Sequence, residues 1–184
     1  MNLGDGTFVE AGAAFGLDGL EDGRGLAAAD FDHDGDVDFV VNNYRARVTC
    51  FQNEVGQARP WIALRLRGTR SNRDGIGATL WVEAGASLQT RVVGAGHGYA
   101  AQYSLEQLVG LGDRERVDRV RVRWPSGLHE AFGPLEARQR RTLVEGTGRA
   151  LAPATSAPSR GRGGWGALLL ALGAALVARA GRRG

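Results

Sequence analysis

Five aspartates gather within nine residues, in the segment Asp30-Phe31-Asp32-His33-Asp34-Gly35-Asp36-Val37-Asp38. Carboxylates at the first, third, fifth and ninth positions, with glycine at the sixth, can wrap a short loop around one hard cation. Without a cation, carboxylates this close together would repel one another. We therefore predict a metal site at Asp30, Asp32, Asp34, Asp36 and Asp38, with Asp36 contributing its backbone carbonyl. Calcium fits better than magnesium, which prefers few carboxylates and retained waters.

The flanks of this loop separate it from an EF-hand. Position 12 of an EF-hand loop is a bidentate glutamate, whereas Val41 occupies it here. The apolar runs before and after the loop, 26–29 and 39–41, favour two strands joined by the loop rather than two helices. The alternative interpretation is a solvated acidic turn that holds no specific ion.

The sequence offers no second set of residues that could do chemistry. The glycine-rich stretch 94–98 lacks a phosphate-loop pattern, so we predict a hairpin connection there. His33, His97 and His129 have no metal-ligand spacing, and no serine lies in a GxSxG elbow. We therefore predict that the chain is not an enzyme. Cys50, the single cysteine, lies in an apolar stretch and is predicted to be buried.

The basic charge of the chain belongs to its C-terminal tail. Residues 151–184 contain five arginines and no acid, whereas residues 1–150 contain 18 arginines and 20 acids. The predicted folded part therefore has no charge excess suited to nucleic acid, which we exclude as a partner. Arg119, Arg121 and Arg123 have the alternating period of a strand's solvent face.

Short strands between turns must form the remainder of the fold, which we predict to be all-β. Alternating or apolar runs cover 61–67, 78–83, 88–93, 108–112 and 117–124, and the second and third of these predict a hairpin around Gly85. A last strand pair is expected between 129–132 and 141–144. Strands at this spacing favour a small antiparallel sandwich or barrel-like domain.

Two segments of the sequence, one N-terminal and one in the middle, each resemble a known family. Asn2–Phe8, the aspartate loop and Val40–Asn43 resemble an FG-GAP/VCBS repeat, which implies a blade of a β-propeller. The blocks at 68–78, 96–99, 110–112 and 122–127 resemble the ASPIC/UnbV domain of cartilage-acidic-protein-like chains. Since a lone blade cannot bury its faces, the resemblance leads us to expect that the chain is a fragment of a longer protein, with the last blade of a propeller at its start.

The C-terminal end resembles a sorting tail. A linker rich in Ala, Pro and Ser leads to Gly163-Gly164, a short apolar run and an arginine cluster, as in GlyGly-CTERM signals of exported bacterial proteins. The alternative is a plain single-helix membrane anchor, since a short segment can thin the bilayer. The predicted organisation is a calcium-binding repeat at 1–55, an ASPIC/UnbV-like β domain at 60–147, a flexible linker at 148–164 and a hydrophobic helix at 165–184.

These patterns together predict a calcium-binding, non-catalytic adhesion or interaction protein that is exported and displayed at a bacterial cell surface. The expected partners are an unknown protein or glycan ligand and, through the tail, the membrane. The alternative function is an accessory or ligand-binding part of a secreted enzyme whose catalytic domain lies upstream.

Overall fold

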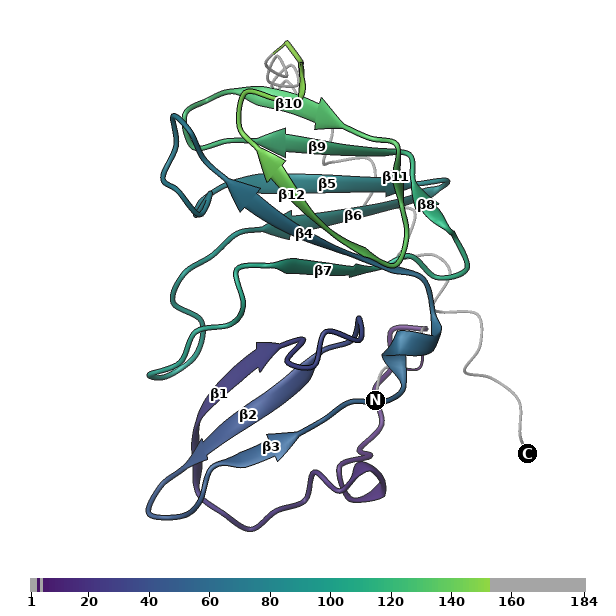
Figure 1. Cartoon of the computed structure of the whole chain (residues 1–184). Coiled ribbons are helices and arrows are strands. Elements are labelled where there is room, and N and C mark those ends of the chain that lie inside the picture. Colours follow the sequence, from purple (N-terminus) through teal and green to yellow (C-terminus); the bar gives the residue numbers. More distant parts are fainter. Residues whose placement is uncertain (1–2, 4, 153–184) are drawn as a thin grey trace, which may run out of the picture. The chain divides into compact units, whose positions relative to one another are not determined.

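Short β-strands make up nearly all the regular structure in residues 3 and 5–152, the part of the chain that the computed structural model describes (Figure 1). The strands are β1 (Gly23–Ala29), β2 (Asp38–Asn43), β3 (Thr49–Phe51), β4 (Trp61–Arg67), β5 (Thr79–Ala84), β6 (Ser87–Val92), β7 (Gln107–Gly110), β8 (Arg116–Val117), β9 (Arg119–Arg123), β10 (His129–Phe132), β11 (Leu135–Glu136), β12 (Gln139–Val144) and β13 (Arg149–Ala150). Two single 3-10 turns, η1 (Ala13–Phe15) and η2 (Gly56–Ala58), are the only helical elements of this part. The predicted all-β class is confirmed.

The N-terminal strands form a three-stranded antiparallel sheet in the order β1-β2-β3. The register of β1 and β2 pairs Ala29 with Asp38, so the aspartate loop is the connection between these two strands. The loop therefore begins and ends at adjacent strand ends, which brings the first and the last aspartate of the motif together.

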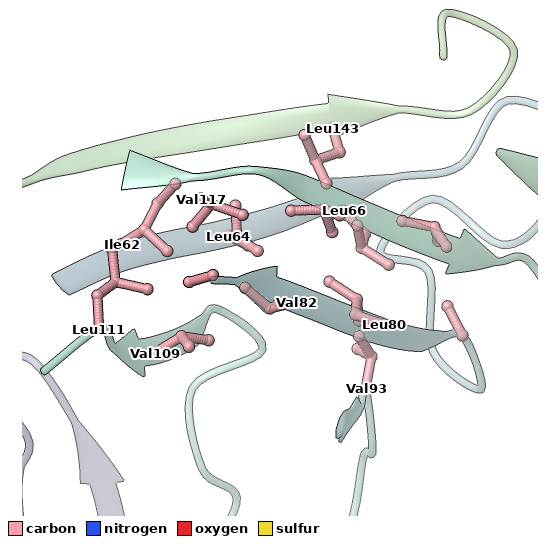
Figure 2. Packing of buried hydrophobic residues seen from close by; sticks show 14 of the residues in the cluster. Ile62, Leu64, Leu66, Leu80, Val82, Val93, Val109, Leu111, Val117 and Leu143 are labelled. Atoms are coloured by element: carbon pink, nitrogen blue, oxygen red, sulfur yellow. The ribbon is translucent and has the colours of Figure 1, made fainter. Parts of the chain in front are cut away.

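The following residues form a five-stranded sheet, in the order β13-β10-β9-β5-β6, and a three-stranded sheet, in the order β12-β4-β7. The labelled side chains of β4 and β5 pack together in the buried core (Figure 2). Alternate residues of β9 belong to the same core, and these three strands supply most of it. The core residues include Ile62, Leu64, Leu66, Leu80, Val82, Val120, Val122 and Leu143. Two sheets packed over one apolar core make a sandwich, and no sheet of the described residues closes into a barrel.

Three details differ from the sequence predictions. The strands at 129–132 and 141–144 do not pair: β10 lies between β9 and β13, while β12 runs parallel to β4. The sandwich is thus antiparallel except at this one pair. Cys50 is exposed rather than buried, because β3 is the edge strand of its sheet. Residues 149–150, predicted to start the linker, form β13 on the edge of the five-stranded sheet.

The predicted β5–β6 hairpin is confirmed, with Gly85 in the left-handed conformation at its turn. The solvent face predicted for β9 is also present, where Arg119 and Arg121 both pair with Glu83 of β5. The predicted hydrophobic helix at 165–184, and the linker from residue 153 on, lie outside the described residues. Within the described part, no helix has the length and apolar character needed to cross a membrane.

A buried carboxylate fastens one end of the sandwich. Glu145 follows β12, and its Oε2 accepts hydrogen bonds from the backbone N–H groups of Thr69, Arg70 and Ser71 at 2.8, 2.7 and 2.7 Å. Its Oε1 accepts hydrogen bonds from the hydroxyls of Ser71 and Ser126. Burial raises the pKa of Glu145, but these hydrogen bonds outweigh it and lower the pKa to about 2. The ionised group therefore joins the loop after β4 to the β9–β10 turn.

We expect Glu145→Gln to destabilise the fold near neutral pH by about 3 kcal/mol, since the pKa falls from 4.5 to about 2 and each unit of pKa corresponds to about 1.4 kcal/mol. The folded-state pKa lies below the unfolded value of 4.5, so this stabilisation is fully present above pH 4.5 and is lost as the pH falls toward 2. Urea denaturation at several pH values should show the wild type and the variant converging below pH 4.5. Exposed Glu136→Gln is the control, and an equal effect of both substitutions would contradict the assignment.

Candidate metal centre

The aspartate loop brings three of its five carboxylates together. Ligand oxygens of Asp30, Asp32 and Asp38 all lie within 4.8 Å of one another. The side chain of Asp30 is 3% exposed and Asp38 is equally buried, whereas Asp32 is open to solvent. Because these oxygens converge and one of the three residues faces solvent, the group could hold a metal ion that enters from the side of Asp32.

Backbone N–H groups hold the two buried carboxylates in place. The Oδ1 and Oδ2 atoms of Asp30 accept hydrogen bonds from Asp34 N and Gly35 N at 3.1 and 3.0 Å. Asp38 accepts hydrogen bonds from Phe31 N at 2.9 Å and from Asn53 N at 2.8 Å. Gly35 has φ +104°, a conformation that side chains rarely adopt, and this turn directs the loop amides inward.

The other two predicted ligands lie differently. Asp34 is outside the converging group, and its Oδ1 accepts a hydrogen bond from Asp36 N at 3.1 Å. The side chain of Asp36 turns away to η2, where its Oδ2 accepts hydrogen bonds from Gly56 N and Gln57 N at 3.0 and 3.2 Å. The prediction that Asp36 contributes its backbone carbonyl is compatible with this contact of its side-chain carboxylate.

Asp36 is the loop carboxylate whose ionised form is disfavoured by its surroundings. Burial raises its pKa, the hydrogen bonds from Gln57 and Gly56 lower it, and the nearby charges of Asp34 and Asp38 raise it again, so that the net shift is upward. Its Oδ1 is buried and accepts no hydrogen bond within the described part of the chain. Concentrated negative charge is therefore only partly compensated by the loop itself.

A residue that sequence reasoning did not identify supplies positive charge. Arg140 of β12 contacts Asp30 through Nη2, at 2.5 Å from Oδ2, and contacts Glu106 through Nη1. The guanidinium also lies over the ring of Trp61, 5.8 Å from its centroid. No local pattern marked Arg140, because its partner Asp30 is 110 residues away in the sequence.

The loop also packs directly against the start of β4. A Cβ atom added to Gly35 would lie 1.9 Å from Nε1 of Trp61, so only glycine fits at this contact. Asp30, Gly35 and Asp36 thus each touch a different part of the chain that follows the first sheet. The candidate metal loop is built into the packing of the sandwich rather than standing free.

Comparison with known proteins finds a family similar to part of the sandwich. Residues 68–150 match the family model described as ASPIC and UnbV. Cartilage acidic protein 1 from Homo sapiens is 54% identical over 44 residues, which are 23% of this chain and 7% of that protein. The Xenopus tropicalis protein of the same name is 43% identical over 62 residues, 32% of this chain and 10% of that protein. The Mus musculus protein is 50% identical over 44 residues, with coverage of 23% and 7%.

The matched segments span a tenth or less of these relatives. The resemblance of the middle segment to the ASPIC/UnbV family is confirmed, whereas the FG-GAP/VCBS repeat and the GlyGly-CTERM tail stay predictions. Residues 68–150 therefore carry an ASPIC/UnbV domain, joined to a strand–loop–strand unit whose aspartates converge.

Proposed function

We propose that this chain is a calcium-stabilised, non-catalytic interaction module of an exported protein. The observation that carries the proposal is the convergence of the Asp30, Asp32 and Asp38 oxygens within 4.8 Å. Hard oxygen donors with high negative charge suit calcium, which takes six to eight oxygens in flexible geometry. Asp34 and the backbone carbonyl of Asp36 would complete the ligand set, in the order that the loop spacing predicts.

The role of the ion would be structural. The bound cation would neutralise the carboxylates that Arg140 and the loop amides compensate only in part. Asp30, Gly35 and Asp36 each contact residues beyond the loop, so fixing the loop also fixes its packing on η2 and β4. Calcium would thereby stabilise the connection between the first sheet and the ASPIC/UnbV domain.

The proposed interaction role rests on the ASPIC/UnbV match and on an exposed apolar surface. Phe31, Phe39 and Phe51 line a pocket of about 320 Å³ on the three-stranded sheet, and Phe31 is largely exposed. An exposed apolar face on a small sheet suits contact with another repeat of the same kind, as the FG-GAP/VCBS resemblance implies. We propose display at a bacterial cell surface, with the tail as sorting signal or membrane anchor.

Calcium binding is tested by isothermal titration calorimetry on the full chain after chelator treatment. We expect one calcium ion per chain, with affinity lowered at least about tenfold by Asp32→Ala, because fewer charged ligands weaken a calcium site. Asp32 is the exposed member of the group, so its loss should spare the fold. Asp113→Ala, which removes an exposed carboxylate elsewhere, is the matched control. Absence of calcium binding by a wild type with an intact β spectrum would refute the proposal.

Arg140→Gln tests whether the guanidinium of Arg140 offsets the negative charge of the aspartate loop. The substitution removes a positive charge beside Asp30, so we expect a melting temperature about 4–8 °C lower without calcium. Calcium should then raise the melting temperature of the variant more than that of the wild type, because the ion no longer competes with a neighbouring cation. Exposed Arg141→Gln on the same strand is the control in differential scanning calorimetry. Equal calcium-induced shifts in both variants would contradict this role of Arg140.

A further inference from the structure

A second pocket lies beside the aspartate loop, and Asp30 is the one residue it shares with the converging aspartates of the proposed metal site. Its volume is about 260 Å³, and it forms where the segment between β6 and β7 crosses the end of β1. Ser104 N donates a hydrogen bond to the backbone oxygen of Ala28 at 3.0 Å, which fixes this crossing. The pocket is therefore formed by elements that come from both the first sheet and the ASPIC/UnbV domain.

Two aromatic rings form one wall of the pocket. His97 and Tyr103 are stacked, with ring centroids 5.1 Å apart and an interplanar angle of 11°. Tyr103 is 37% exposed, so part of its surface remains available to a ligand. Each ring covers one face of the other, so a ligand can pack only on an outer face of the stack. An aromatic face with a polar edge favours a ligand that has an apolar face and a polar rim.

One carboxylate provides a fixed hydrogen-bond acceptor. Glu106 lines the pocket, and the guanidinium of Arg140 contacts it. Because its charge is partly neutralised and its orientation is set, Glu106 can accept a hydrogen bond from a neutral hydroxyl group. Asp30 also lines the pocket, but its buried oxygens already accept hydrogen bonds from Asp34 N, Gly35 N and Arg140. Ser104, which also lines the pocket, adds a hydroxyl that both donates and accepts.

Apart from Gln107, the remaining lining is apolar. Ala28, Ala29, Val92 and Leu108 carry no polar side-chain atoms and suit the C–H groups of a ligand. The volume lies just below the range of about 300–1,000 Å³ that is typical of pockets for drug-sized ligands, which limits the occupant to about one ring. Two carboxylates in the lining disfavour an anionic ligand such as a phosphate or a uronate.

We propose that this pocket binds one neutral hexose ring of a glycan. One face of the sugar ring packs on the outer face of the His97–Tyr103 stack, and a sugar hydroxyl donates to Glu106. The inference deepens the proposed interaction function by naming its ligand class. It does not require calcium, since His97, Tyr103 and Glu106 are not part of the converging aspartates.

Saturation-transfer difference NMR on the full chain tests the proposal with D-glucose, D-galactose, D-mannose and N-acetyl-D-glucosamine as separate probes. We expect transfer to at least one of them at millimolar concentration, with D-glucuronate giving less. Tyr103→Ala and Glu106→Gln should each weaken binding about tenfold or more, because they remove the aromatic wall and a charged acceptor. Tyr99→Ala is the matched control, since Tyr99 lies on the same segment, is 75% exposed and does not line the pocket.

The outcomes separate this inference from the calcium proposal. Asp32→Ala, measured in parallel, should keep sugar binding while it loses calcium affinity, so either proposal can fail alone. Absence of transfer to all four neutral sugars, in a sample with an intact β spectrum, would overturn the hexose site. Stronger binding of D-glucuronate, or equal losses in the Tyr99 and Tyr103 variants, would also overturn it.

Discussion

Negative charge concentrated at one turn is the constraint to which much of this structure responds. Asp30, Asp32 and Asp38 approach within 4.8 Å, and carboxylates at such distances repel one another unless positive charge or N–H donors face them. Backbone amides of the loop donate hydrogen bonds to these carboxylates. Arg140 of β12, 110 residues after Asp30, adds a positive charge beside them. The repulsion among the loop carboxylates is thus reduced in part by a residue that is distant in the sequence. The loop therefore depends on the folded sandwich for its stability.

The sandwich provides the rigid frame for these contacts. Strand β4 presents apolar residues to the core, and its first residue, Trp61, lies against both Gly35 and Arg140. Strand β12 pairs with β4, which places Arg140 beside the loop, while Glu145 fastens the end of the same strand. One pair of parallel strands therefore positions the cation that faces Asp30 and the carboxylate that closes the far end of the domain.

Local patterns in the sequence were sufficient for part of this picture. The spacing of the aspartates predicted the loop and three residues that converge in it, and alternation with a glycine turn predicted the β5–β6 hairpin. Features that depend on distant partners escaped prediction. Alternation cannot reveal that β12 pairs with β4 instead of β10, or that Cys50 lies on an edge strand. Arg140 and the contact of Asp36 with η2 likewise depend on the completed fold.

The pairing of β4 with β12 has a consequence for how the chain folds during synthesis. Strand β4 is made early, but its parallel partner is complete only at Val144, so one backbone edge of β4 stays unpaired until then. An unpaired apolar strand is a template for association with other chains. Once paired, β12 is one of the two outer edges of the three-stranded sheet, and exposed Arg141 places a charge there that discourages further strand addition. The strand that pairs with β4 thus also leaves a charged side chain on the edge that it forms.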